Sequence, residues 1–578
     1  MKRKELKRQH ISQLVAVIVI LIFFNLLGGI KFFRLDLTSE RRYSLAGISK
    51  ETLRQLESPV LIKVYLDGQL PSDLLQFRKS VREILDEFRA YGGKQIEYEF
   101  INVYDEPDET VRNSIMKNLS GKGLRLTDIQ LKDKEGGFTT RIIFPGALVN
   151  FKGVDFPVNL LKNNPALPYH VNLNNSVQSL EYEFIRAIRS LTSGKVEKIA
   201  FIEGHRELDY YDVYDISSEL SLFFQIDRGA IRGELDKLLE YKAIIIAQPL
   251  QKFNEADKFA IDQYIMRGGN ALFFLDPVDI LADSLVSGKT YTSFADVNIY
   301  DLLFKYGFRM DYNLVKDLQC SFVRVESSVE GQNPTVRLMP WWYFPLFSPR
   351  SDHVVTRGLN YILGRYVSAI DTSTATLPGV QRTVLLAASD TCAKIENPVF
   401  ISMDEITGKP DGRVFNKSGL PVVILSEGTF ESFYSNYGVP DGVTPRDVNI
   451  IKKSRPAKVL VAGDGDLIRN DVKVSGGEPL PLTLGYDHDT RQTFGNKEFI
   501  LNVINYMTDD HGLITLRKKE FKLRILNRAL IRTSSLKLKW KLINMILPSA
   551  CILSFAVAYS FFRKRRYAIR NDSQSKAG

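Results

Sequence analysis

Five polar residues follow predicted strands at the point where each strand ends. They are Glu203 and His205 after one apolar run, Asp276 after a second, and Asp464 and Asp466 after a third. The carboxyl ends of parallel strands meet at one edge of an open α/β sheet, which is where such proteins bind ligands. These residues therefore predict a candidate site for a small ligand or a metal. The ordinary alternative, which we favour, is that Gly and Asp are the residues that turns use after strands.

Glu203 and His205, with Glu207, form the most suggestive cluster, because a histidine next to a carboxylate can transfer protons. No nucleophile signature accompanies them: the chain has no G-x-S-x-G, H-E-x-x-H or G-x-x-x-x-G-K-[ST] motif. Cys392 is predicted to be an ordinary cysteine, and Asp487-His488-Asp489 is predicted to be a surface turn rather than a metal site. We therefore expect no enzyme, no catalytic residues, no metal and no cofactor, and the chain is not itself an ATPase.

Residues 195–510 alternate between predicted strands and helices. The strands are Lys198–Glu203, Ala243–Ala247, Ala271–Leu275, Thr383–Ala387, Val422–Ser426 and Lys458–Gly463. The helices are Ile216–Phe224, Asn254–Met266 and Lys497–Met507. Trp341–Phe344 is assigned to a proline-rich loop. This alternation predicts an α/β fold with an open, doubly wound sheet and a parallel core.

Residues 38–192 predict a smaller α/β unit. Its elements are a short helix within 38–57, strand Val60–Leu66, helix Asp73–Tyr91, strand Ile96–Val103, several strands over 127–160, and helix Ser176–Leu191. The strand–helix–strand order predicts a parallel pair. Ser49 and Asn175 are the predicted N-caps of the first and last of these helices.

The positive charge of the chain is confined to a few short segments. The net charge is +10, yet residues 1–10, 517–541 and 563–578 carry +4, +9 and +5, which leaves −8 for residues 11–516. A duplex-binding protein would carry its basic patch on the folded domain, so nucleic acid is excluded as a partner. Cys320, Cys392 and Cys551 form no CxxC pair, and spacing alone leaves open whether Cys320 and Cys392 are joined.

Two uncharged apolar segments lie beside these basic segments. Residues 11–30 and 542–562 are each long enough to cross the hydrocarbon core of a bilayer as a helix. We interpret the first as a retained anchor, since a cleaved signal peptide has a shorter apolar region and a small-x-small cleavage site. Two spans place both tails on the same side, and basic tails favour the cytoplasm, although basic residues also flank the other ends of the spans.

The expected organisation follows from these segments. It consists of a basic tail 1–10, a span 11–30, a first unit 38–192, a second unit 195–510, a basic segment 517–541, a span 542–562 and a basic tail 563–578. Long basic side chains suit lipid headgroups. The candidates for contact with the membrane surface or a permease are Lys518, Lys519, Lys537 and Lys539.

The layout resembles the auxiliary, substrate-binding-like proteins of the gliding-motility-associated ABC transporter of Bacteroidetes. The residues that carry the resemblance are Phe33–Thr38, Arg41–Leu45, Arg141–Ala147, Leu180–Phe184, Ile202–His205, Phe494–Phe499, Ile504–Tyr506, Arg517–Glu520 and Leu523–Leu526. The resemblance covers essentially the full length of the chain, both spans included.

This resemblance implies partners and a location. It implies an ABC permease, a cytoplasmic ABC ATPase, the bacterial inner membrane, cytoplasmic tails and a periplasmic domain. It also implies an amidotransferase-like second unit without the catalytic cysteine, and a first unit that is thioredoxin-like in strand order but has no CxxC. It supplies no catalytic residues, and it implies no particular transported substrate.

Three functional hypotheses remain open from the sequence. The first is an accessory transporter subunit that binds a ligand or a partner. The second is a membrane-tethered hydrolase or amidase of the cell envelope that uses Glu203 or His205. The third is a structural scaffold of a motility apparatus, which differs from the first only in having no small ligand.

Overall fold

The computed structural model describes most of the chain. The described residues are 11–23, 44–132, 138–162, 168–192, 196–281, 285, 288–327, 335–349, 353–372, 377–444, 448–510, 512–518 and 534–575. The chain divides into two compact units, Met1–Glu520 and Phe521–Gly578. Both sheets described below belong to the first of these, so the predicted division into domains 38–192 and 195–510 stays a prediction.

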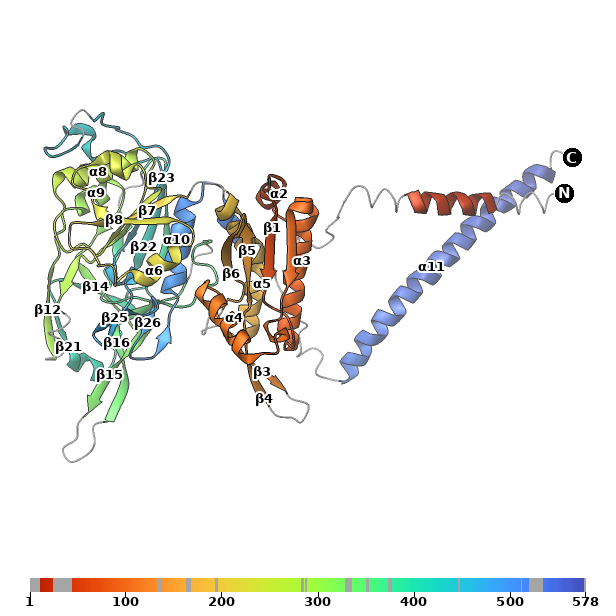
Figure 1. The fold of residues 1–578 in the computed structure, drawn as a ribbon, viewed down its shortest axis with the longest axis horizontal. Helices are drawn as coiled ribbons and strands as arrows, with labels where there is room; N and C mark the ends of the chain where they lie inside the picture. The colour runs from red at the N-terminus through yellow and green to blue at the C-terminus, as the bar shows by residue number, and fades with distance from the viewer. Residues whose placement is uncertain are drawn as a thin grey trace. The chain divides into compact units, whose positions relative to one another are not determined.

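A four-stranded sheet comes first along the chain (Figure 1). Its strands are β1 (Val60–Val64), β2 (Ile96–Phe100), β5 (Gly146–Phe151) and β6 (Val154–Asn159), in the order β2-β1-β5-β6. β1 and β2 are parallel, as predicted, and the other two pairs are antiparallel. Helix α3 (Ser72–Gly92) connects the two parallel strands. Its apolar residues recur at helical spacing, which is why this segment forms a helix with one apolar face. The side chains that it buries on the sheet are Leu74, Phe77, Val81, Leu85 and Phe88.

Two further elements complete this region. Helix α4 (Glu109–Gly121) is capped by Asp108, which accepts from the backbone N–H groups of Thr110 and Val111. It buries Leu119 against Leu148, on the side of the sheet opposite to α3. Strands β3 (Thr127–Lys132) and β4 (Phe138–Ile143) form a separate antiparallel ribbon.

Helix α5 (Tyr169–Thr192) packs on the same face of the sheet as α3. It begins at Tyr169 rather than at Ser176, so Asn175 lies inside the helix and its predicted role as an N-cap is wrong. A polar run such as VNLNNS signals a cap when it is read locally. In the folded chain Asn172 and Ser176 are buried, and the Ser176 hydroxyl donates to the carbonyl of Asn172 at 2.8 Å.

The first turn of helix α2 (Gly47–Arg54) is held by a residue far along the chain. Glu181 Oε1 in α5 accepts hydrogen bonds from the backbone N–H of Ala46 and from the hydroxyl of Ser49, both at 2.7 Å. The N-cap position is Ala46, whose side chain cannot accept a hydrogen bond. The predicted capping role of Ser49 is therefore wrong: this residue lies inside α2, fully buried, and donates to the remote carboxylate.

Removing this carboxylate should loosen α2. Glu181→Ala leaves the Ala46 N–H and the Ser49 hydroxyl without their acceptor, and loss of a helix cap costs about 1–2 kcal/mol. We expect faster proteolytic cleavage within residues 44–57 of the full-length protein, measured by limited proteolysis and mass spectrometry. Glu57→Ala, which removes an exposed carboxylate just after α2, is the control and should leave cleavage unchanged. Equal cleavage of both variants would contradict the role of Glu181.

A seven-stranded sheet is the larger of the two main sheets of the first unit. Its strands are β7 (Lys198–Glu203), β8 (Gln225–Ala230), β9 (Ala243–Ala247), β10 (Asn270–Phe274), β19 (Val380–Ala387), β22 (Pro421–Gly428) and β23 (Ala457–Ala462). Their order is β19-β22-β23-β10-β9-β7-β8. The five strands from β23 to β8 are parallel, as predicted, and β22 and β19 add an antiparallel edge.

Helices cover both faces of this sheet. Ala243, Ile245 and Ala247 of β9 face one apolar cluster, which includes helices α6 (Tyr214–Leu220) and α10 (Asn496–Thr508). Ile244 and Ile246 face a second cluster with α8 (Glu255–Met266) and α9 (Tyr300–Lys305). Burial on both faces explains why this strand is continuously apolar rather than alternating. Helix α8 is capped by Asn254, which accepts from the N–H of Asp257 at 2.8 Å.

The predicted loop at Trp341–Phe344 is wrong. These residues lie in strand β16 (Thr335–Phe347), which is antiparallel to β15 (Cys320–Ser327). Trp341 and Tyr343 are buried with Leu314 and Ile401. The prolines suggested a loop because proline cannot donate to a ladder, but Pro340 and Pro345 are accommodated in this ribbon.

Shorter elements complete the first unit. They are α7 (Leu235–Leu238), β11 (Val278–Ile280), β12 (Lys289–Phe294), β13 (Arg309–Met310), β14 (Asn313–Asp317), β17 (Ile362–Leu363), β18 (Ile370–Asp371), β20 (Cys392–Glu396), β21 (Phe400–Ser402), β24 (Val472–Ser475), β25 (Glu478–Pro481), β26 (Tyr486–Asp487) and β27 (Gln492–Thr493). Cys320 and Cys392 are buried as free thiols.

Helix α11 (Ser534–Ser575) is the described part of the second unit. Its segment Leu538–Arg565 is long and apolar enough to cross a membrane, and it contains the predicted span 542–562. The helical backbone continues to Ser575, through most of the predicted tail 563–578. Near the other terminus, Ile11–Phe23 is a shorter apolar helix, and residues 24–30 of the predicted span lie outside the described residues, as does the tail 1–10.

Candidate functional site

The carboxyl ends of β9, β10 and β23 bring three of the predicted site residues together. β10 lies between β9 and β23 in the sheet, so Asp276 after β10 is adjacent to Asp464 and Asp466 after β23. Asp276 accepts hydrogen bonds from Gln248 Nε2, after β9, and from the backbone N–H of Gly465, both at 2.6 Å. One carboxylate therefore ties together the ends of three neighbouring strands.

Gly465 is required for this close approach. A Cβ atom at this position would lie 2.6 Å from Gln248 Cγ and 2.8 Å from Asp276 Oδ2. Any side chain would push the Asp276 carboxylate away from the Gly465 N–H, from which it accepts a hydrogen bond. The glycine in this acidic turn is thus explained by packing against Asp276 and not by a phosphate.

Asp464 is fully buried and is the N-cap of the 3-10 turn η6 (Gly465–Ile468). Its carboxylate accepts from the backbone N–H of Asp466 at 2.8 Å and from that of Arg365 at 3.0 Å. Burial, and after it the negative charge of Asp466, raise the pKa of Asp276 to about 7. Burial and the charges of Asp466 and Asp276 raise the pKa of Asp464 well above its ordinary value.

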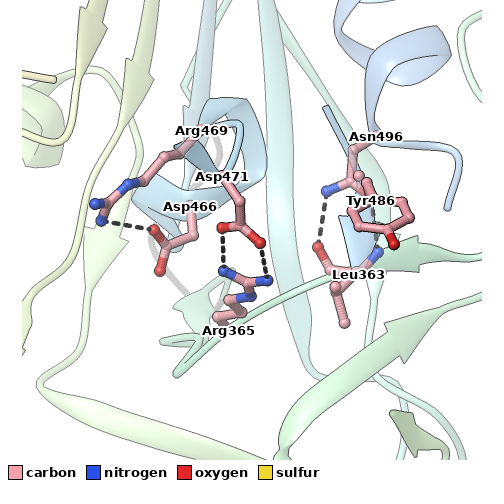
Figure 2. A pocket seen from close by; sticks show the side chains of 8 residues that line it. Leu363, Arg365, Asp466, Arg469, Asp471, Tyr486 and Asn496 are labelled. Atoms are coloured by element: carbon pink, nitrogen blue, oxygen red, sulfur yellow. Dashed lines mark hydrogen bonds and ion pairs between the residues drawn. The ribbon is translucent and has the colours of Figure 1, made fainter. Parts of the chain in front are cut away.

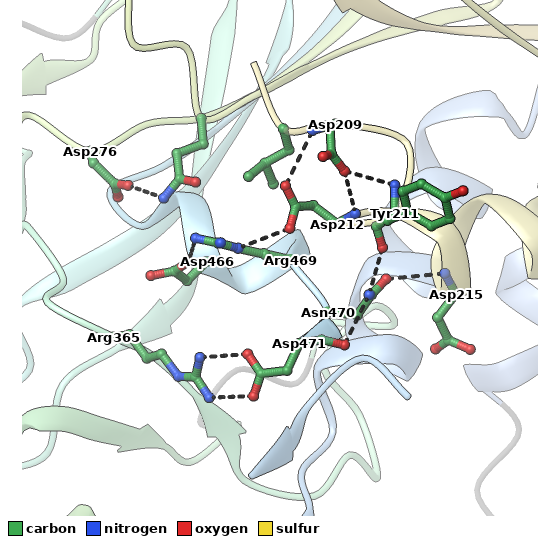
Figure 3. A network of polar contacts seen from close by, with 12 residues as sticks. Asp209, Tyr211, Asp212, Asp215, Asp276, Arg365, Asp466, Arg469, Asn470 and Asp471 are labelled. Carbon is green, nitrogen blue, oxygen red and sulfur yellow. Dashed lines mark hydrogen bonds and ion pairs between the residues drawn. The ribbon is translucent and has the colours of Figure 1, made fainter. Parts of the chain in front are cut away.

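Two arginines neutralise the surrounding carboxylates (Figure 3). Arg365 forms a two-pronged ion pair with Asp471, at 2.9 and 3.1 Å. Arg469 lies 3.4 Å from Asp212 in the loop after β7 and 3.5 Å from Asp466 after β23. Burial lowers the pKa of Arg365, but the hydrogen bond and charge of Asp471 outweigh it and raise the pKa. The network therefore fastens three loops at one edge of the sheet.

A small pocket lies beside this network (Figure 2). Its volume is about 10 Å³, which is about enough for a single water molecule. It is lined by Leu363, Arg365, Asp466, Arg469, Asp471, Gly485, Tyr486 and Asn496. Asn496 exchanges two hydrogen bonds with the backbone of Leu363, at 2.8 and 3.0 Å. A pocket of this volume has room for a water molecule or a single small ligand group and not for an organic molecule.

His205 is not part of this network. Its Nδ1 lies 3.0 Å from Glu207 Oε1, its Nε2 lies 3.2 Å from Asp257 Oδ2, and its ring stacks on Phe253 at 3.7 Å. Burial lowers the pKa of His205, but the hydrogen bonds to Asp257 and Glu207 outweigh it and raise the pKa to about 9. The ring is therefore a buried imidazolium at neutral pH. With both nitrogens occupied by carboxylates, it is poorly placed to accept a proton from a substrate.

Glu203 points to a different partner. Its Oε1 accepts from Arg228 Nε in β8 at 2.7 Å, and the same arginine donates to the carbonyl of Leu208 at 2.8 Å. Glu203 and His205 are thus two residues apart in sequence but are bound to different elements. Of the predicted cluster, His205 and Glu207 are therefore in contact, whereas Glu203 is paired with Arg228.

Several residues of the network were not predicted from the sequence. Arg365, Arg469 and Asp471 lie outside any recognised motif, and Arg365 is about a hundred positions from its partner in the chain. The only local signal was the Asp-Gly-Asp turn at 464–466. Among the described residues, no three His, Cys, Asp or Glu side chains are arranged to hold a metal ion.

The predicted lysine contacts lie at the border of the described residues. Lys539 is exposed on α11. The side chains of Lys518 and Lys537, and all of Lys519, lie outside the described residues.

Comparison with known proteins assigns the larger sheet to a family. Residues 197–503, more than half of the chain, match the auxiliary family described as "ABC-type uncharacterized transport system". The chain belongs to this family. Residues 39–150 of this family member match a domain of unknown function, DUF7088. No curated protein matches.

One similar solved structure is described as "mmIFT52 N-terminal domain". It is 14% identical, and the alignment covers 54% of this chain and 99% of that chain with a TM-score of 0.31. That score is too low to support an argument. The family match supports an accessory role in an ABC-type transport system, and with the apolar C-terminal helix it indicates membrane association.

Proposed function

We propose that this chain is an inner-membrane accessory subunit of an ABC transporter and works by binding a permease and a cytoplasmic ATPase. The observation that carries the proposal is the family match over residues 197–503. The apolar segment Leu538–Arg565 supports an anchor at the C-terminal end. The basic tails 1–10 and 563–578 support tails in the cytoplasm and a periplasmic folded unit. The resemblance found in the sequence extends the proposal to a gliding-motility system.

The contacts at the charged edge of the seven-stranded sheet argue against catalysis there. Its carboxylates accept from backbone N–H groups or pair with Arg365 and Arg469. A pocket of about 10 Å³ leaves little room for an organic substrate. The hydrolase hypothesis needs a free acid or base at Glu203 or His205. Glu203 accepts from Arg228, and the two nitrogens of His205 face Glu207 and Asp257.

Co-purification is the direct test of this proposal. We expect the tagged full-length protein, extracted in mild detergent, to recover a multi-span permease and an ABC ATPase in fixed proportion, as identified by mass spectrometry.

Changing Lys518, Lys519, Lys537 and Lys539 to Gln should lower this recovery if the basic segment contacts the permease or its lipids.

The control is a matched set of four substitutions on exposed lysines far from that segment in the sequence. Lys79, Lys94, Lys117 and Lys473 serve this purpose, and their change to Gln should leave recovery unchanged. Recovery of neither transporter subunit, from a preparation that remains folded and membrane-inserted, would contradict the accessory-subunit proposal.

A further inference from the structure

Helix α5 contacts a segment near each end of the folded part of the chain. On the N-terminal side, Glu181 of α5 fixes the first turn of α2 through the two 2.7 Å hydrogen bonds described above. On the C-terminal side, the 3-10 turn η7 (Leu513–Lys518) packs against α5. Ile514 and Leu516 of η7 are buried in the same apolar cluster as Leu180 of α5. The two segments that lead to the apolar helices therefore both start from elements that pack against α5.

This region is continuous with the amino edge of the seven-stranded sheet. Helix α10, which precedes η7, ends at that edge. Asn270 Nδ2, at the start of β10, donates to the carbonyl of Met507 at 3.0 Å. Lys458 Nζ, at the start of β23, donates to the carbonyl of Tyr506 at 2.6 Å. The Asp276–Asp464 network lies at the other ends of the same two strands.

The connecting segments are short. Thirteen residues lie between the predicted end of the first span at Ile30 and Ser44, and fifteen lie between Lys518 and the start of α11 at Ser534. A fully extended chain of fifteen residues reaches about 50 Å at most. Two such tethers that start at one helix restrict which side of the folded unit can approach a bilayer.

We propose that the surface formed by α2, α5 and η7, together with the amino edge of the seven-stranded sheet, faces the lipid surface, and that the charged carboxyl edge faces away from it. This inference rests on the membrane anchoring in the proposed function. It assigns the α2–α5–η7 surface to contact with lipid headgroups and places Arg365, Arg469 and their aspartates on the side away from them.

Two exposed leucines that flank β9 provide a matched pair of probes. Leu239 lies before the strand at the amino edge and is 44% exposed, and Leu250 lies after it at the carboxyl edge and is 57% exposed. Five strand residues separate their ends of the sheet by roughly 17 Å. Each leucine is changed to Cys in the full-length protein with Cys551→Ser, since Cys320 and Cys392 are buried. Glu51→Cys on α2 is a third probe.

The measurement is energy transfer from a dye on each cysteine to acceptors on lipid headgroups. The protein is reconstituted in nanodiscs of phosphatidylethanolamine and phosphatidylglycerol. We expect transfer at least about twofold stronger from Glu51→Cys and Leu239→Cys than from Leu250→Cys, because the latter site is farther by about one strand length.

Equal transfer from Leu239→Cys and Leu250→Cys, or stronger transfer from Leu250→Cys, would overturn this inference and leave the transporter proposal standing. Stronger transfer from Leu239→Cys without recovery of a permease or ATPase would support the inference and contradict the transporter proposal. The two proposals therefore fail separately.

Discussion

Replacing His205 by alanine is expected to destabilise the folded unit by about 3–5 kcal/mol, because removing one partner of a buried charge cluster leaves the others uncompensated. The two carboxylates that would lose their cation, those of Glu207 and Asp257, are almost fully buried. His205 lies in the loop after β7 and contacts Asp257 of α8 at 3.2 Å, so the change would loosen the contact between this loop and the helix. Asp257 would keep its hydrogen bond from the backbone N–H of Gly233, at 2.6 Å.

The same cluster predicts a pH dependence of stability. The pKa of His205 rises from an ordinary value of 6.5 to about 9 on folding. A group with a raised pKa contributes stability that is fully present below pH 6.5 and is lost as the pH rises through 9. We therefore expect the thermal unfolding midpoint of the full-length protein in detergent to fall between pH 7 and pH 10. This fall should be smaller in His205→Ala.

His488→Ala is the matched control, because His488 is exposed in the turn between β26 and β27. It should change neither the midpoint nor its pH dependence. If His205→Ala kept the wild-type midpoint while abolishing the function of the protein in the cell, a structural role for the imidazolium would be contradicted. The envelope-hydrolase hypothesis would then become the better explanation.

Adding a single methyl group at Gly463 should also have a large effect. A Cβ atom there would lie 2.1 Å from the carbonyl oxygen of Ser368. The backbone cannot move easily, since the N–H of Ser368 donates to the Gly463 carbonyl at 2.7 Å and the Gly463 N–H donates to Val422 at 2.9 Å. Overpacking in a rigid interior typically lowers the free energy of unfolding by about 1–3 kcal/mol. Because the added methyl group would meet backbone atoms, we expect Gly463→Ala to lower it by about 3 kcal/mol.

Differential scanning fluorimetry of the full-length protein measures this loss. The control is Gly412→Ala, because a Cβ atom at Gly412 meets nothing within 4 Å and its φ is not positive. It should leave the unfolding midpoint unchanged or slightly raised, since alanine restricts the unfolded chain more than glycine does. Equal midpoints for Gly463→Ala and Gly412→Ala would show that the loop after β23 is not held as described.

Elements with a strong repeating pattern were predictable from the sequence. The apolar run Ala243–Ala247 is a central strand with the predicted bounds, and the strand Lys198–Glu203 is equally well predicted. The predicted helix Asn254–Met266 differs from α8 by one residue at its start, where the Asn254 side chain accepts from the N–H of Asp257 in the first turn of its own helix. In each case the interactions that define the element are local, or the burial is uniform enough to be visible in residue types.

Predictions failed where a distant residue supplied the deciding interaction. Ser49 looks like a cap, but Glu181 satisfies the start of α2 from 132 positions away. Trp341 and Tyr343 looked like loop residues beside prolines, but they lie within strand β16 and are buried beside Leu314. Local patterns report backbone preferences, and tertiary contacts override those preferences when they bury more surface.

Residue types and their order were enough to predict the apolar helices, the confinement of basic charge beside them and the parallel core of the larger sheet, and they contain no catalytic motif. Which polar residues meet depends on the folded chain. It joined Asp276 to Asp464 through Gly465, recruited Arg365 and Arg469, and separated His205 from Glu203. The physical reason is that a polar side chain pairs with whatever donor or charge the strand order brings near, and strand order is set by packing across the whole sheet.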